Sequence, residues 1–238
     1  MRILMAMPVW RSQIPPETVE SLVNLKRGDH EIRFCMPQGF LTFEGRNIAV
    51  EAAKEWMCDA IFWVDSDMVI PEDALLKMVA LLDKYEVISG VYYKRCDGAA
   101  TPLVYERISD DIYKFKVVIG TGIQEVEGVG FGCCLTSMTA FDGMGLPFMY
   151  KRVAAGYSSE DLYFCNNYIK KGKKIAVDTS IKCGHVGSKI YTEKDWIKFK
   201  PCPSAEEAEK ILRQFEKSDD KVELANEILK EEMKNGKV

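Results

Sequence analysis

The sequence lacks an apolar run of the roughly 18 to 20 residues that a membrane-spanning helix needs. Its 238 residues carry a formal net charge of −4, so no strong positive field favours nucleic acid or an anionic membrane. The first residues also lack the apolar stretch and cleavage pattern of a signal peptide. From these absences we expect a cytoplasmic protein without a transmembrane segment or a nucleic-acid partner. A polyanionic ligand would have to be bound by a few basic residues or by a metal.

Cysteine pairs and histidines are also scarce. None of the eight cysteines belongs to a C-x-x-C pair, and most stand inside apolar runs, so we expect reduced and mostly buried thiols. The two histidines are His30 and His185. What the chain does have is an ordinary globular composition, with 47% hydrophobic and 29% charged residues and enough length for a sizeable core.

The first half of the sequence alternates between strand and helix patterns. Short apolar runs predict strands at 2–7, 30–36, 60–64 and 86–93, and amphipathic segments predict helices at 18–25, 46–57 and 71–85. This alternation predicts a parallel sheet wound by right-handed crossovers. Ligands of such sheets bind at the carboxyl ends of the strands.

In the second half strand patterns follow one another with little helix between them, which predicts a mixed sheet. Strand composition returns at 103–108, 112–119 and 174–178, and one helix is predicted at 160–171, ending at Gly172. From Ser204 onward two helix patterns follow, the first with a Ser-x-x-Glu capping box. We therefore predict an α/β domain at 1–203 and a helical C-terminal extension at 204–238. The extension either packs on the domain or serves oligomerisation.

Two carboxylates follow the buried strand AIFWV at 60–64. Asp65 and Asp67 stand at alternate positions where this strand ends, so both can face one hard cation at the mouth of a site. The spacing alone is common by chance. A structural alternative is that Asp67 caps the helix that begins near Pro71, while Asp65 is merely solvated.

Three further features favour a functional site. Arg46 and Asn47 stand at a predicted helix start, where arginine suits a phosphate or a base edge, although a surface arginine is the more common case. Glu160 and Asp161 stand at another helix start, where they either stabilise the helix or place one carboxylate in the cleft as a general base. His185, in the segment CGHVG, is either a satisfied polar group or a metal ligand.

The order of these features resembles that of nucleotide-sugar glycosyltransferases of the GT-A fold, and most of all their large family 2. The resemblance covers about residues 2–190. It rests on the strand that ends at Pro8 and Val9, GRN at 45–47, DSD at 65–67, the glycine-rich segment at 128–132, SED at 159–161 and a C-terminal histidine. It implies a Rossmann-like mixed sheet flanked by helices. It also implies a metal-dependent enzyme that moves a sugar from a nucleoside diphosphate to an acceptor hydroxyl.

The resemblance assigns the donor and the metal to particular residues. Mn²⁺ or Mg²⁺ would be held mainly by Asp67, with Asp65 and His185 as further ligands. The donor is expected to be a UDP-sugar rather than a GDP-sugar. Its nucleotide and diphosphate would contact Pro8, Val9, Trp10, Arg11, Arg46, Asn47, Asp65 and Ser66.

The acceptor side is implied in the same way. Gly130, Phe131 and Gly132 would line the sugar and acceptor pocket, because glycine permits close approach. Asp161 or Glu160 would be the catalytic base, with Asp161 favoured if the enzyme inverts. The acceptor would be a saccharide, a protein or a small molecule.

Departures from the family pattern limit these expectations. The Q-x-x-R-W motif of processive polysaccharide synthases is absent, which argues against processive synthesis. The segment 188–196 is instead either a mobile loop, with Lys189, Tyr191 or Lys194 closing over the diphosphate, or an ordinary surface loop. A sugar nucleotidyltransferase is one alternative, but the glycine-rich loop of that class is missing from MPVWRSQIPP. The other is a non-catalytic nucleotide- or sugar-binding protein on the same fold.

Overall fold

A computed structural model describes residues 1–9, 13–95, 101–109, 112–116, 118, 120–153 and 156–194. Trp10, Arg11 and the predicted helical extension at 204–238 lie outside these residues. Within the described part of the chain, no helix combines the length and the apolar character needed to cross a membrane.

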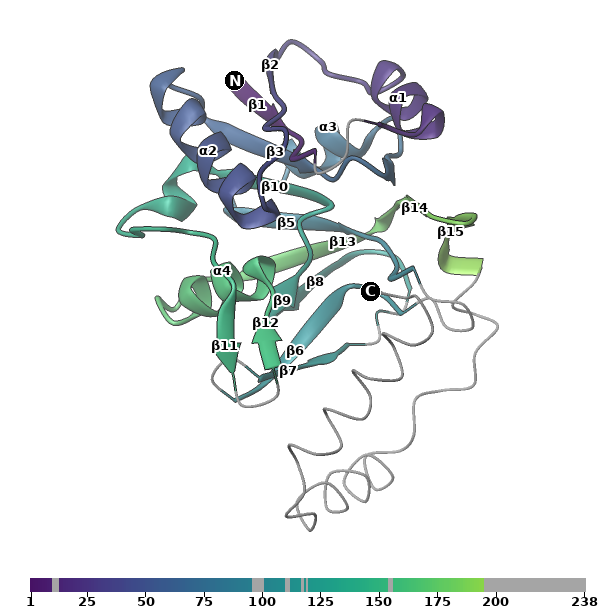
Figure 1. Cartoon of the computed structure of the whole chain (residues 1–238). Coiled ribbons are helices and arrows are strands. Elements are labelled where there is room, and N and C mark those ends of the chain that lie inside the picture. Colours follow the sequence, from purple (N-terminus) through teal and green to yellow (C-terminus); the bar gives the residue numbers. More distant parts are fainter. Residues whose placement is uncertain are drawn as a thin grey trace. The chain divides into compact units, whose positions relative to one another are not determined.

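The first half of the chain forms the predicted alternation of strands and helices (Figure 1). Its elements are β1 (Arg2–Ala6), α1 (Pro16–Val23), β2 (Glu31–Cys35), α2 (Thr42–Glu55), β3 (Ala60–Val64), β4 (Met68–Val69), α3 (Ala74–Val79) and β5 (Val87–Val91). The short strand β4 was not predicted, because two residues are too few to show a pattern.

The second half is rich in strands, as its composition predicts. Its elements are β6 (Val104–Ser109), β7 (Ile112–Phe115), β8 (Ile123–Val126), β9 (Gly128–Val129), β10 (Cys133–Ser137), the 3-10 helix η1 (Met138–Phe141), β11 (Lys151–Val153), β12 (Gly156–Ser158), α4 (Glu160–Ile169), β13 (Ile175–Lys182), β14 (Gly184–Val186) and β15 (Ile190–Tyr191). Helix α4 ends near Gly172, whose φ of 74° is readily reached only by a residue without a side chain.

The central sheet is mixed and has the order β2-β1-β3-β10-β5-β13-β8. β1 pairs in parallel with β2 and β3, and β5 pairs in parallel with β13. β10 lies between β3 and β5 and is antiparallel to both. The mixed sheet is therefore confirmed, but the position of β10 was not predicted, because a strand that enters between two earlier strands leaves no local signal in the sequence.

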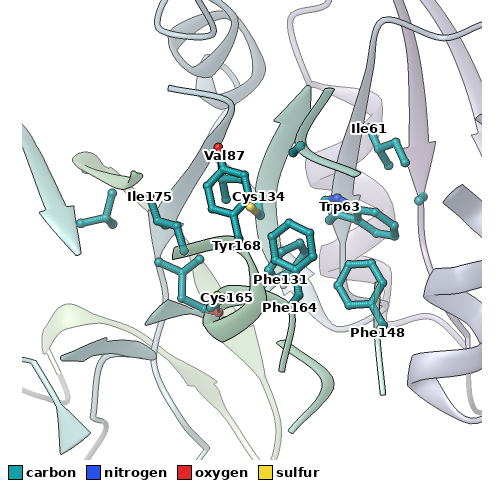
Figure 2. Close-up of a cluster of buried hydrophobic side chains, with 14 of the residues drawn as sticks. Ile61, Trp63, Val87, Phe131, Cys134, Phe148, Phe164, Cys165, Tyr168 and Ile175 are labelled. Carbon is teal, nitrogen blue, oxygen red and sulfur yellow. Dashed lines mark hydrogen bonds between the residues drawn. The ribbon is translucent and has the colours of Figure 1, made fainter. Parts of the chain in front are cut away.

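Both faces of the sheet are covered, which explains why the inner strands β1, β3 and β5 are buried along almost their whole length. On one face α2 and α4 pack over a core that includes Leu4, Ile61 and Trp63. On the other face α3 and part of α1 pack over Ile3, Met5 and Phe62. Figure 2 shows the first of these cores, in which aromatic rings gather around Trp63; they are those of Phe131, Phe148, Phe164 and Tyr168.

The predicted boundaries of helices α2 and α3 are wrong. Helix α2 begins at Thr42 rather than Arg46, because the Glu44 carboxylate accepts a hydrogen bond from the backbone N–H of Leu41 at 3.0 Å and so closes an earlier first turn. Helix α3 covers Ala74–Val79 only, and the chain continues in turns after it. As a result Arg46 lies inside α2, away from the amides that an anion would meet at its N-terminus.

Candidate functional site

Several of the predicted site residues gather at the carboxyl ends of β1, β3 and β5, as expected for an open sheet. The amino end of the antiparallel β10 and the first turn of α4 meet at the same edge. A cavity of about 420 Å³ opens there. Its lining residues are Pro8, Phe40, Thr42, Arg46, Asp65, Ser66, Asp67, Tyr92, Arg95, Leu103, Glu160, Asp161 and His185.

Asp67 and His185 lie together on one side of the cavity. The strands β4 and β14 pair antiparallel, with His185 opposite Met68, and the backbone carbonyl of Asp67 accepts a 2.8 Å hydrogen bond from Val186 N–H. His185 Nε2 lies 3.4 Å from Asp67 Oδ1. Helix α3 begins at Ala74 with Asp73 at the N-cap position, so the alternative that Asp67 caps this helix is wrong.

The environment of Asp67 keeps its carboxylate ionised. Burial by itself would raise the pKa of Asp67, but the hydrogen bond and charge of His185, together with the charge of Arg95, hold that pKa below its usual value. Arg95 Nη1 lies 2.7 Å from Asp67 Oδ2. Asp67 therefore presents a charged carboxylate to the cavity, with one oxygen facing an imidazole and the other a guanidinium.

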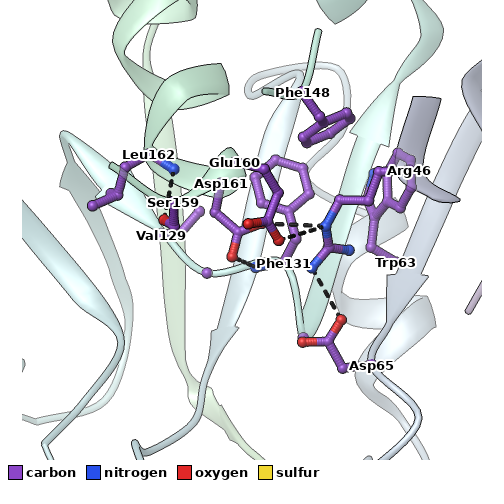
Figure 3. Close-up of polar contacts among 12 residues, drawn as sticks. Arg46, Trp63, Asp65, Val129, Phe131, Phe148, Ser159, Glu160, Asp161 and Leu162 are labelled. Atoms are coloured by element: carbon purple, nitrogen blue, oxygen red, sulfur yellow. Dashed lines mark hydrogen bonds and ion pairs between the residues drawn. The ribbon is translucent and has the colours of Figure 1, made fainter. Parts of the chain in front are cut away.

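Asp65 does not join Asp67 and His185 but pairs with Arg46. The Arg46 Nη2 donates to Asp65 Oδ1 at 3.0 Å, and Arg46 Nε lies 3.4 Å from Glu160 Oε1 and 3.3 Å from Asp161 Oδ1. Figure 3 shows the guanidinium between these carboxylates. The Arg46 side chain is 1% exposed, so it joins two walls of the site from within the protein.

Aromatic rings enclose the same guanidinium. The Arg46 Cζ atom lies 5.5 to 5.9 Å from the ring centroids of Trp63, Phe131 and Phe148. Burial alone would lower the pKa of Arg46, but the charges of Asp161 and Asp65 hold it above its usual value. A permanently charged Arg46 therefore offsets part of the negative charge of the site.

Glu160 and Asp161 begin helix α4, which is capped by the Ser159 hydroxyl accepting from Leu162 N–H at 3.4 Å. We expected at most one of these carboxylates in the cleft, but both reach Arg46 and line the cavity. Burial, followed by the charge of Glu160, raises the pKa of Asp161 well above its usual value, and Arg46 only partly opposes this.

Tyr92 connects several of these groups. The Tyr92 hydroxyl accepts a hydrogen bond from Gly132 N–H at 3.0 Å. The Gly132 carbonyl in turn accepts a hydrogen bond from Asp65 N–H at 3.1 Å. The neighbouring Phe131 N–H donates to Asp161 Oδ2 at 3.3 Å. A Cβ on Gly130 would overlap the Tyr92 hydroxyl. The backbone of residues 130–132 thus holds the backbone of Asp65 and the carboxylate of Asp161, and its glycines make room for a tyrosine.

Several predicted site residues have other surroundings. The Phe131 side chain is buried in the core and contributes only its backbone to the site, because its ring packs against Trp63 and Phe164. Asn47 does not line the cavity, since its amide donates to the Phe148 carbonyl at 2.8 Å and accepts from Phe148 N–H at 3.1 Å. Val9 is buried and pairs with Gln38.

The segment 188–194, the described part of the predicted closing loop, does not reach the cavity. Tyr191 is buried and pairs in β15 with His185, and the ammonium of Lys189 lies 5.0 Å from the centre of the Tyr191 ring. Neither these two residues nor Lys194 lines the cavity. Pro8 and Ser66, two of the residues predicted to contact the donor, do line the cavity.

The residues around Asp67 suit a divalent metal in part. His185 Nδ1 lies 2.7 Å from the Tyr93 carbonyl, which can only accept a hydrogen bond, so Nδ1 carries a proton and Nε2 is the nitrogen that a metal would bind beside Asp67. Among the described residues no three acidic, histidine or cysteine side chains converge as a complete ligand set. Mg²⁺ and Mn²⁺ accept few protein ligands when phosphate oxygens and water complete the sphere. Asp67 and His185 fit that arrangement.

Sequence reasoning missed Tyr92 and Arg95. Both follow β5, whose carboxyl end lies at the same edge of the sheet as the end of β3. The signal that could have found them is their position, because the residue just after any parallel strand of this sheet faces the site. The predicted strand at 86–93 instead included Tyr92 as an ordinary strand residue.

Comparison with known proteins gives structures but no sequence family. No family model and no curated protein matches the sequence. The crystal structure of A197 from STIV aligns with 79% of this chain and 86% of its own, with a TM-score of 0.58 and 22% identity. GalNAc-T7, solved with UDP, GalNAc and Mn²⁺, aligns with 82% of this chain and 45% of its own, with a TM-score of 0.55 and 10% identity. These likenesses show the fold, which is of the GT-A glycosyltransferase type.

Proposed function

We propose that this protein is a metal-dependent glycosyltransferase, similar to family 2, that moves a sugar from a UDP-sugar to an acceptor hydroxyl. The observation that carries the proposal is one cavity lined by Asp67 and His185 as well as by Glu160 and Asp161. A charged metal-binding pair and a general base are the two devices that this reaction needs. The shared fold with GalNAc-T7, solved with UDP and Mn²⁺, supports the same assignment. In this proposal residues 1–203 are the catalytic domain and 204–238 an extension.

The donor would lie against the ends of β1 and β3. Asp67 and His185 would hold Mn²⁺ or Mg²⁺, which would offset the charge of the diphosphate leaving group. Pro8 and Ser66 line the cavity just after these two strands and would border the nucleotide. Asp65 would orient the donor from a fixed position, since both its backbone and its carboxylate are held, by Gly132 and Arg46 respectively.

Asp161 would take the proton from the acceptor hydroxyl. A carboxylate whose pKa is raised toward the working pH is a stronger base than an ordinary one and is still ionised in part. Burial and Glu160 provide that raised pKa. The hydrogen bond from Phe131 N–H to Oδ2 fixes the orientation of the group.

The donor class can be tested by thermal unfolding with nucleotides. We expect UDP to raise the unfolding temperature only when Mn²⁺ is present, because the diphosphate needs the metal beside Asp67. A ligand at about 100 times its Kd adds about 2.7 kcal/mol to the free energy of unfolding, which is readily measured. Absence of a shift with any nucleoside diphosphate, with or without metal, would overturn the proposal. Binding without release of UDP in the presence of any acceptor would identify the non-catalytic alternative.

The role of Asp161 can be tested through the pH dependence of turnover. Asp161 is active as a base when it is ionised, and its pKa is raised. We therefore expect the plot of rate against pH to have a rising limb that lies above the usual carboxyl range. Glu160→Gln removes the like charge beside Asp161, so the limb should move to lower pH, whereas Asp161→Asn should abolish it. The control is Glu51→Gln, since Glu51 is exposed on α2. A limb that stays in place in Glu160→Gln contradicts the assignment.

A further inference from the structure

Arg95 is the exposed cation of the candidate site. It lies just beyond β5, and its side chain is 49% exposed, against 1% for Arg46, the other arginine that lines the cavity within the described residues. Arg46 is held in place by ion pairs with Asp65, Glu160 and Asp161. Arg95 has no such confinement and can exchange one anionic partner for another.

The present partner of Arg95 is the carboxylate proposed to bind metal. Arg95 Nη1 lies 2.7 Å from Asp67 Oδ2, while Asp67 Oδ1 faces His185 Nε2 at 3.4 Å. A divalent cation between Asp67 and His185 would stand close to the guanidinium. Two positive charges at that separation repel each other, and the carboxylate cannot stabilise both equally. Arg95 and the metal therefore compete for Asp67.

The remaining contacts of Arg95 allow it to move while staying at the cavity. Its Nη1 also donates to the Val186 carbonyl at 3.2 Å, a single neutral acceptor. Its aliphatic stem lies against Gly187, where an added Cβ would be 3.0 Å from Arg95 Cδ. The stem is thus held at the rim, and the guanidinium can turn from Asp67 toward another anion in the same cavity.

We infer that Arg95 is a diphosphate-binding residue that neutralises Asp67 in the metal-free protein and turns to the phosphate oxygens when a divalent metal takes its place. The inference rests on the proposed function for the identity of the diphosphate. On this inference Arg95 weakens the binding of the metal and strengthens the binding of UDP. The two roles predict effects of opposite sign for one substitution, which a merely structural ion pair does not.

The experiment measures two affinities by calorimetry, that of Mn²⁺ alone and that of UDP at saturating Mn²⁺. In Arg95→Gln the Kd for Mn²⁺ should fall about 2- to 5-fold, the range expected for losing one partly exposed ion pair. The Kd for UDP should rise about tenfold or more, because a charge-assisted hydrogen bond to phosphate is lost. Arg95→Lys keeps the charge but lacks the planar guanidinium. Its Kd for UDP should therefore lie between those of Arg95→Gln and the parent protein.

Lys94→Gln is the matched control. It makes the same change of charge at the adjacent exposed residue, which does not line the cavity, and should leave both affinities unchanged. Thermal unfolding of each variant checks that the fold is intact. If Arg95→Gln leaves both affinities at the parent values, or weakens both, the inference is wrong while the proposed function stands. If the parent protein binds neither Mn²⁺ nor UDP, both the proposed function and this inference are wrong.

Discussion

Asp67→Ala should abolish metal-dependent turnover while the protein remains folded. Asp67 provides the charged oxygen nearest His185 Nε2, and it is the one acidic side chain in contact with that nitrogen among the described residues. Loss of metal stabilisation of the leaving group, worth several kcal/mol, should slow turnover about a thousandfold. The fold should survive, because the hydrogen bond that Asp67 makes to Val186 N–H uses its backbone carbonyl.

The measurement is the rate of UDP release as a function of Mn²⁺ concentration, with the unfolding temperature recorded in parallel. Asp67→Asn is the second variant, since it keeps the shape of the side chain and removes only its charge. Asp83→Ala makes the same substitution at an exposed residue far from β3 in the sequence and should behave as the parent protein. Turnover by Asp67→Ala at the parent rate, with the same metal dependence, rules out Asp67 as a metal ligand.

The part of the site that could be predicted comes from the ends of strands. An apolar run followed by Asp65 and Asp67 shows both a buried strand and the edge at which it ends, because burial and period are local properties of the sequence. The pairing of Asp67 with His185 could not be derived that way. It depends on β4 meeting β14, two strands of two and three residues that are far apart in the chain.

Arg46 illustrates a signal that was present but was interpreted differently. Position 46 shares a helix face with Ala49, Val50 and Ala53, all fully buried, so the helical period places its side chain inside the protein. An arginine on a buried face requires anionic partners. Their identity could not be predicted, because Glu160 is 114 residues away and its approach depends on how α4 packs over the sheet.

No local pattern in the sequence indicates that β10 lies between β3 and β5. This position of β10 nevertheless affects the site most. Had β5 paired directly with β3, the backbone of residues 130–132 would not lie between Tyr92 and Asp65. The glycines there were predicted to permit close approach of the sugar or the acceptor, but neither Gly130 nor Gly132 lines the cavity. The group that approaches is the Tyr92 hydroxyl of this same chain.

Arg46→Met should destabilise the protein by about 3 to 5 kcal/mol at neutral pH, the cost of leaving buried carboxylates without their partner. Methionine suits the volume and the aromatic surroundings, so the loss reports on charge more than on packing. The carboxylates of Glu160 and Asp161 would then share a buried position with no adjacent cation. The free energy of unfolding is measured from urea titrations at pH 7 and pH 5.

The cost of Arg46→Met should shrink as the pH falls. Without Arg46 the folded-state pKa of Asp161 rises further above that of the unfolded chain, so the folded variant takes up a proton first and gains stability relative to the parent on acidification. Adding Glu160→Gln should restore part of the loss at neutral pH, because one uncompensated charge is removed. Arg33→Met, at an arginine whose side chain is 44% exposed, should cost less than about 1 kcal/mol. A loss that is equal at both pH values, and unchanged by Glu160→Gln, would mean that Arg46 acts through packing rather than through charge.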